Sequence, residues 1–363
     1  MANVFIYWVT LLMDLRVENM NSKKKVGKFE LPSGFTSRCA TLADAQIVTD
    51  MLNAESLATI GKTQFSFEEC HQEWSIPGFD LEKSSVIVIA PNGQVAGYTE
   101  VDDLTAEMPV RPFVFGATHP DFWGMGIGTW MLAWSEKTLE RAVSLVPDGT
   151  QVAMEAASYR TVTQGIKMFE GYGMRPKRSY FRMLIDLDEK QHAYAPVDPD
   201  GLTLVPLKEY GDIPAAALAK EDGWKDHYGH VERSAELAIK QFEHVVADAA
   251  VDHDLVYLLL DGDDVAALII NVLKADEQPD IGYVRTLVVR KPWRRRGLGK
   301  YLLEKSFNAF YERGGFKQVA LDVDAESLTG ATDLYLKAGM RVERENVLFE
   351  KILQAGENLS TVD

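Results

Sequence analysis

The sequence predicts two domains of the α/β (α+β) class in tandem, and three observations support this. The chain has 363 residues, enough for two domains that each bury their own core. A similar order of short apolar strands and amphipathic helices occurs in each half. Two helix ends also align, Phe169–Met174 with Tyr335–Met340, at an offset of 339 − 173 = 166 residues between their glycines. We therefore expect one architecture, repeated.

In the first half, strands and helices follow from alternating and 3.6-residue apolar periods. The expected strands are Phe35–Cys39, Ser85–Ala90, Val95–Glu100, Phe113–Ala117 and Gln151–Glu155. The expected helices begin near Leu42–Ala45, cover Ser66–Trp74 and Thr129–Ala142, and end at Gly173. A Pro-Asn-Gly turn joins the second and third strands into a hairpin.

The second half repeats this order. Its expected strands are Leu202–Val205, Leu255–Leu260, Val265–Val272, Tyr283–Val289, Lys317–Val323 and Val347–Ile352. Its expected helices are Ile213–Ala219, Ala235–Ala249, Leu298–Tyr311 and Thr329–Ala338, the last closed by a glycine in a usual cap position.

Domain boundaries follow from composition. Residues 189–200 are polar, contain two prolines and read as a linker between domains at 34–188 and 201–354, with a tail at 355–363. Residues 1–33 are expected to be an N-terminal arm that is poorly ordered or wrongly included, since translation could begin at Met20. The apolar stretch Met1–Met13 lacks the basic start and cleavage site of a signal peptide and is too short to span a bilayer.

Charge and cysteine content exclude several classes of function. The formal net charge of −16 argues against a nucleic-acid partner and mildly favours a cationic substrate. Cys39 and Cys70 form no C-x-x-C pair, and the seven histidines form no zinc pattern, so neither a metal nor a disulfide framework is expected. We expect a cytoplasmic protein with no membrane partner.

The most informative motif is Arg294-Arg-Arg-Gly-Leu-Gly-Lys300, which follows a Val-rich strand and opens a helix. Glycine lets the backbone approach a ligand closely, and the free amides of a first helical turn attract an anion. The motif is not a P-loop, because Tyr301 follows the lysine, and it lacks the third glycine of a Rossmann fingerprint. It therefore predicts a phosphate-bearing ligand of another class.

This motif resembles the acetyl-CoA pyrophosphate loop of the GNAT superfamily of N-acetyltransferases. Downstream, Leu321–Met340 is similar to the second signature of the family, in which a strand with a polar end precedes a helix carrying a Leu-Tyr pair. The two-domain plan resembles that of mycothiol synthase-like members. The resemblance implies, for each domain, a mixed and mostly antiparallel central sheet flanked by helices, and acetyl-CoA as co-substrate. The plan alone identifies no acceptor.

The resemblance also implies roles for single residues. Tyr335 matches the tyrosine that protonates the departing thiolate, and a phenol can donate to a group with a pKa near 8.5. Ser327 stands where asparagine is common, and could cap the next helix or reach the cofactor. The pantetheine arm would bond to the backbone of Leu287, Val288 and Val289, and the pyrophosphate to Arg294, Arg295, Arg296, Gly297, Leu298, Gly299 and Lys300.

The amine must lose a proton before it attacks, so a base or a water chain is needed. Tyr283 stands near the position where the family often has a glutamate. Asp280, Asp322 and Asp324 lie nearby, but a structural role is expected for them and a water relay is the preferred route. An acceptor segment resembling that of other two-domain members contains Trp224, Asp226, His227 and Tyr228, which could instead pack on the core.

The first domain carries a degraded copy of the loop, with Gly124, Gly126 and Gly128 retained. Trp123 stands where Arg294 stands in the second copy, and Phe169 replaces the tyrosine. We therefore expect a vestigial cofactor loop in a catalytically silent domain.

Taken together, these features predict an acetyl-CoA-dependent N-acetyltransferase. It would transfer the acetyl group directly to a primary amine of a small molecule, in the second domain, as a monomer or homodimer. The alternatives are a non-catalytic protein that binds or senses an acyl-CoA or small molecule, and a purely structural role.

Overall fold

The computed structural model describes residues 25–75, 79–102, 110–188, 198–228, 230, 233–275, 278–327 and 330–359. Their contacts divide them into two compact units. Unit 1 comprises the described residues up to Lys177 together with Val347–Leu359, and unit 2 comprises those of Arg178–Asn346. Met1–Met13, Met20 and most of the expected linker lie outside the described residues.

Unit 1 contains a mixed sheet in the order β3-β4-β5-β6-β7-β14. Neighbours from β3 to β6 are antiparallel, whereas β6 and β7 are parallel. Its strands are β3 (Thr36–Arg38), β4 (Ser85–Ile89), β5 (Val95–Asp102), β6 (Phe113–Thr118), β7 (Val152–Tyr159) and the C-terminal part of β14 (Arg341–Gln354). Its main helices are α2 (Ala45–Ile60), α3 (Phe67–Trp74), α5 (Ile127–Thr138), α6 (Glu140–Leu145) and α7 (Thr163–Tyr172), and a short hairpin of β1 (Lys25–Val26) and β2 (Phe29–Glu30) precedes them.

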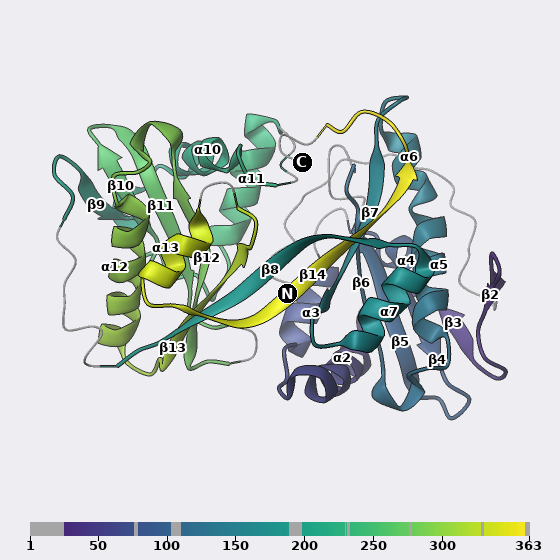
Figure 1. Ribbon diagram of the computed structural model, residues 1–363. Helices are drawn as coiled ribbons and strands as arrows, with labels where there is room; N and C mark the ends of the chain where they lie inside the picture. Colours follow the sequence, from purple (N-terminus) through teal and green to yellow (C-terminus); the bar gives the residue numbers. More distant parts are fainter. Residues whose placement is uncertain are drawn as a thin grey trace. The chain divides into compact units, whose positions relative to one another are not determined.

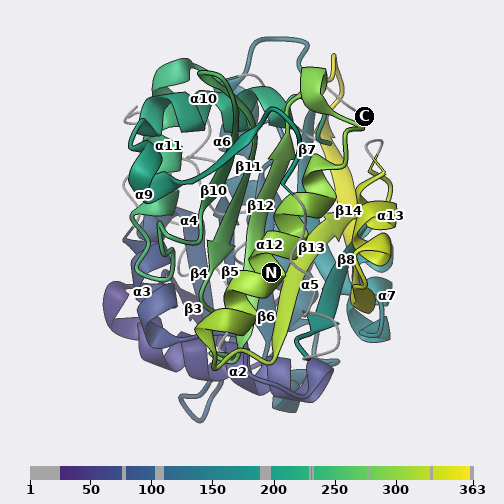
Figure 2. The same cartoon turned by 90° about the vertical axis from the view of Figure 1, so that its left-hand side faces the viewer.

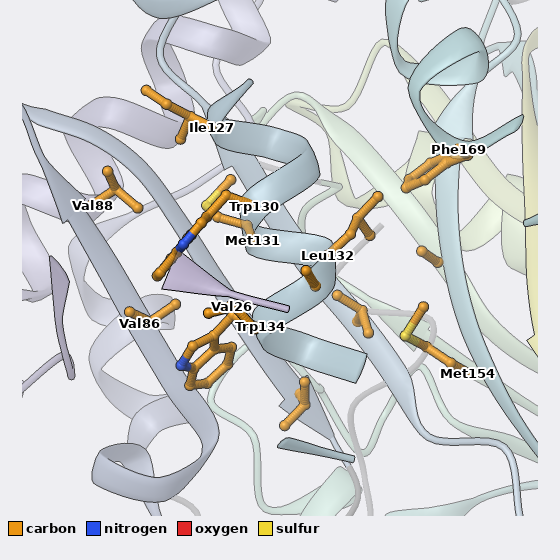
Figure 3. Close-up of a cluster of buried hydrophobic side chains, with 14 of the residues drawn as sticks. Val26, Val86, Val88, Ile127, Trp130, Met131, Leu132, Trp134, Met154 and Phe169 are labelled. Atoms are coloured by element: carbon orange, nitrogen blue, oxygen red, sulfur yellow. The ribbon is translucent and has the colours of Figure 1, made fainter. Parts of the chain in front are cut away.

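The core of unit 1 forms where α5 covers the sheet. Trp130 and Trp134 of α5 are almost completely buried and lie on the side of the helix that faces Val86 and Val88 of β4 (Figure 3). Two fully buried indole rings exclude a large apolar area from water and fix the helix firmly against the strands.

Unit 2 contains a sheet in the order β8-β13-β12-β11-β10-β9. Only β12 and β13 are parallel among these neighbours. Helices α10 and α11 lie on one face of the sheet, and α12 and α13 lie on the other (Figure 2). The strands are β8 (Arg175–Asp186), β9 (Thr203–Pro206), β10 (Tyr257–Asp261), β11 (Asp264–Val272), β12 (Ile281–Val289) and β13 (Gln318–Asp324). The helices are α9 (Leu207–Tyr210), α10 (Ile213–Trp224), α11 (Ala235–Val246), α12 (Leu298–Arg313) and α13 (Ala331–Lys337). The short helix α4 (Leu81–Ser84) belongs to unit 1.

The two units exchange their last strands. From Arg178 onward, β8 belongs to unit 2, where Tyr180–Asp186 pair antiparallel with β13. From Val347 onward, β14 (Figure 1) belongs to unit 1. Its Val347 and Phe349 are buried in the core of that unit. The sequence predicts boundaries that follow chain order, and it predicts no strand at residues 175–186. In the structure, unit 1 instead combines the described residues up to Lys177 with Val347–Leu359, and unit 2 lies between them in the chain.

The structure confirms the predicted fold class, since both units have a mixed, mostly antiparallel sheet flanked by helices. In the described part of the chain, no helix is both long and apolar enough to cross a membrane.

Candidate active site

In unit 2, β12 and β13 separate partway along their length. They pair only from Ile281 with Gln318 to Tyr283 with Ala320. Beyond that point the described strands form no further ladder pair, so β12 turns unpaired backbone groups toward the gap. Leu287, Val288 and Val289, expected to bind the pantetheine arm, lie along this unpaired part and bond to β11 on their other side. Such a gap offers backbone donors and acceptors to an extended amide-bearing chain.

The glycine-rich loop crosses the end of this gap. A short turn, Lys291–Trp293, leads through Arg294 to Gly297, which caps α12 with φ of 81°. The amide of Tyr301 bonds to the carbonyl of Gly297, whereas those of Leu298, Gly299 and Lys300 have no backbone acceptor among the described residues. Free amides backed by the helix dipole form an anion site.

The three arginines of the loop have different surroundings. The Arg294 side chain donates from Nε to the Val289 carbonyl at 2.9 Å, and it also bonds to the Gly223 carbonyl and to Asp226. It therefore braces the loop against β12 and α10. Arg295 and Arg296 are exposed and form no ion pair with described residues, so they are the cations available to a pyrophosphate. Arg295 has φ of 61°, a conformation that costs about 1–2 kcal/mol for a residue with a side chain.

Tyr335 lies in the core on α13, next to the first turn of α12. A Cβ atom at Gly299 would lie 3.0 Å from Leu334, so α12 and α13 approach closely there. The Tyr335 side chain is 8% exposed, and burial raises its pKa to about 12. Its hydroxyl makes no hydrogen bond to another described residue. A neutral phenol with an uncommitted proton is suited to act as a general acid. Ser327 is partly buried before α13, and its amide bonds to the Asp324 carbonyl.

The α10 face of the sheet carries a polar network at the point where the strands separate. The Tyr283 hydroxyl donates to Asp322 at 2.9 Å, and Arg182 of β8 donates to the same carboxylate at 2.7 Å. The Arg182 guanidinium also lies 4.8 Å from the centre of the Tyr283 ring. Asp322 is thus held by two donors, whereas Asp280 pairs with Lys317 at the surface.

A second arginine from β8 contacts the predicted acceptor segment. Arg178 pairs with Asp324 at 2.9 Å, and its guanidinium lies 4.2 Å from the centre of the Tyr228 ring. His227 stacks on Trp224 with 4.6 Å between ring centres, and burial lowers the pKa of His227 to about 4. The imidazole is therefore neutral at pH 7.

Asp226 faces Arg294, which lowers the pKa of this carboxyl. The structure thus places Tyr228 and Tyr283 against two arginines of β8, Arg178 and Arg182, whereas Asp226 bonds to Arg294 of the glycine loop.

The loop of unit 1 has the same backbone without the charge. Gly126 caps α5 with φ of 83°, and the amide of Trp130 bonds to its carbonyl. The Trp123 indole N–H donates to the Thr118 carbonyl at 2.7 Å, five residues earlier, as Arg294 does to Val289. Trp123 therefore keeps the hydrogen bond that supports the loop, but it lacks the positive charge of Arg294.

The remaining positions of this loop also differ from those in unit 2. Gly124 has φ of 78° where Arg295 stands in the other loop, and Gly128 lies against Met168. Phe169, at the position of Tyr335, packs on Phe349 with 5.1 Å between ring centres.

Sequence reasoning missed the arginines at positions 178 and 182. They are four residues apart on β8, so their side chains lie on the same face of the strand. The charged residues of this segment are uncommon in strands, and the sequence pattern therefore did not indicate one. The alternation Arg178, Tyr180, Arg182 before the buried Met183–Ile185 was the available signal.

Comparison with known proteins agrees with this geometry. Residues 220–340 match the acetyltransferase (GNAT) family. The chain is similar over 91% of its length to a GCN5-related N-acetyltransferase from Sphaerobacter thermophilus, with 31% identity, 99% of that chain covered and a TM-score of 0.76. It also shares the fold of a tandem GNAT protein from the clavulanic acid biosynthesis pathway, with 14% identity, a TM-score of 0.62, and coverage of 89% of this chain and 100% of that one. No curated protein sequence matches. This chain is therefore a tandem member of the GNAT superfamily of acetyl-CoA-dependent acetyltransferases.

Proposed function

We propose that the chain transfers an acetyl group from acetyl-CoA directly to the primary amine of a small molecule, and that the reaction takes place in unit 2. The observation that carries this proposal is the difference between the two loops. Both present free amides at a helix start, but only the loop of unit 2 adds exposed Arg295 and Arg296 and a neighbouring tyrosine.

In this mechanism, the loop of unit 2 binds the pyrophosphate through the amides of Leu298–Lys300 and the two exposed arginines. The unpaired part of β12 holds the pantetheine arm and so places the thioester in the gap. The amine nitrogen attacks the thioester carbonyl, the C–S bond breaks, and the thiolate takes the proton of the Tyr335 hydroxyl. Water near Asp322 carries the proton from the amine to solvent, and a proton from solvent returns to the Tyr335 phenolate, so the acid is restored for the next turnover.

Unit 1 is proposed to support unit 2 without turnover of its own. Trp123 and Phe169 remove the loop cation and the acid, while the backbone of the loop is retained. A nucleotide-like ligand could still bind there without reacting.

The test is release of coenzyme A thiol from acetyl-CoA with a panel of primary amines, combined with calorimetric titration of acetyl-CoA. We expect amine-dependent thiol release. Binding of acetyl-CoA without release for any amine would instead favour a binding or sensing protein, and absence of both would favour a structural role.

A further inference from the structure

A lysine of α10, Lys220, lies beside the candidate acceptor site. Lys220 is on the face of α10 that packs against β12, because Gly223, one turn later, would place a Cβ atom 2.0 Å from Val288. The Lys220 ammonium lies 5.1 Å from the centre of the Trp224 ring, and the described residues form no ion pair with it. Burial lowers the pKa of Lys220 to about 8, and the charges of Arg233 and Arg285 act in the same direction.

The nearest strand adds a second cation on this side. The register of β11 and β12 shifts from Ile270 with Thr286 to Asn271 with Val284, so Arg285 is an extra residue in a bulge. Bulges re-aim side chains and are common beside active sites. The Arg285 side chain is 9% exposed and pairs with Asp248 at 3.7 Å. In unit 1, β5 and β6 pair without such a shift.

An unsatisfied hydrogen-bond donor lies in the same place. The Trp224 indole N–H is buried and has no acceptor among the described residues. Buried donors in native proteins normally have partners, so an orphaned one calls for a ligand, ion or water. The Lys220 ammonium lies over this ring, so the ammonium and the indole N–H are two neighbouring donors that could both bind acceptor oxygens.

We infer that the acceptor amine also carries a carboxylate, which Lys220 and Trp224 bind on the α10 side of the gap with Arg285 nearby. This inference rests on the proposed acetyl transfer and names its substrate class: an amino acid or a related amino-carboxylate. It differs from the expectation drawn from the net charge, which favours a cationic acceptor, because the charged group beside Trp224 is the cationic Lys220.

The test uses the full chain with pairs of primary amines that differ only in one group, such as β-alanine and β-alaninamide, over several chain lengths. Thiol release gives kcat/KM, and calorimetry gives binding of the same compounds. We expect the best acid to exceed its amide about tenfold or more in kcat/KM, the range for a charged hydrogen bond.

Two variants and one control locate the effect. Lys220→Met should raise KM for the acid and remove the preference for the acid over its amide. Trp224→Phe keeps the ring but loses the donor, and should weaken the preference several-fold. Lys225→Met, on an exposed lysine that pairs with Asp222, should retain it.

The outcomes separate this inference from the proposed function. Faster acetylation of amides than of acids, or a preference that survives Lys220→Met, would overturn the inference and leave acetyl transfer standing. Binding of acids that depends on Lys220, without thiol release for any amine, would support the site and refute the transfer.

Discussion

At the residue scale, the catalytic proposal depends most on one buried hydroxyl. Burial raises the pKa of Tyr335 to about 12, so the phenol holds its proton throughout the physiological range. At the equivalent position of unit 1, Phe169 shows that the fold accommodates an aromatic ring without the hydroxyl.

Tyr335→Phe should therefore lower kcat by about 100-fold, the lower range for general acid catalysis, with little change in acetyl-CoA affinity. The measurement is thiol release at saturating acetyl-CoA, with thermal unfolding as the control for folding. Turnover within twofold of the native chain would remove Tyr335 from the mechanism.

A second residue makes the stability of unit 1 depend on pH. Glu100 is buried on β5 and accepts hydrogen bonds from Trp74 at 3.2 Å and from the Tyr98 hydroxyl. Burial raises its pKa to about 7, above the ordinary glutamate pKa of 4.5. The folded state thus holds this proton more tightly, and the resulting stability is present below pH 4.5 and lost as pH rises through 7.

Glu100→Gln should reduce this loss, which amounts to at most about 3 kcal/mol at 1.36 kcal/mol per pKa unit. The measurement is the free energy of unfolding in denaturant between pH 5 and pH 8 for both proteins. Glu55, whose pKa burial also raises to about 7, contributes equally to both. Parallel pH profiles would show that Glu100 does not titrate in this way.

At the element scale, the site depends on how closely α10 approaches β12. Gly223 permits this contact, since a Cβ atom there would overlap Val288. Alanine normally stabilises a helix relative to glycine, so the local and tertiary effects oppose each other here.

Gly223→Ala should destabilise unit 2 by about 1–3 kcal/mol, because the added methyl overpacks the contact. The matched control is Gly171→Ala in α7, where a Cβ atom meets nothing within 4 Å, and where about 0.5–1 kcal/mol of stabilisation is expected. Denaturant unfolding measures both. Val288→Ala should partly rescue Gly223→Ala, and equal effects at the two glycines would contradict the packing argument.

Much of this scale could be predicted from the sequence, because alternating apolar residues and glycine signals are local. Apart from β8, the strands between Ser85 and Val289 and the two helices that follow the glycine loops agree with their expected positions within a few residues. The strand β8 could not be predicted in this way. Its arginines are typical of a loop when the local sequence is considered alone. Their partners, Asp322 and Asp324, lie more than 130 positions later in the chain, so the local pattern gives no sign of the pairing. Likewise, the Arg-Arg-Arg-Gly-Leu-Gly motif predicts a ligand loop, but it does not predict that Arg294 bonds to Val289 and Asp226 and so supports that loop.

At the scale of the whole molecule, the exchange of last strands connects the two halves of the chain functionally. Arg178 and Arg182 follow unit 1 in the chain, yet they hold Asp324 and Asp322 in unit 2. The buried Met183–Ile185 anchor the same strand in the core of unit 2. The first half thus supplies residues to the candidate site even if its own loop is silent.

The central claim is that acetyl transfer takes place at the loop of unit 2. Gly297 and Gly126 test it directly, because they cap equivalent helices at φ of 81° and 83°, and a Cβ atom at either meets nothing within 4 Å. Valine imposes the same backbone strain at both. We expect Gly297→Val to lower amine-dependent thiol release by about 100-fold, as loss of preorganised backbone donors does, while Gly126→Val stays within about twofold of the native rate. Loss of turnover in Gly126→Val with retention in Gly297→Val would contradict the claim.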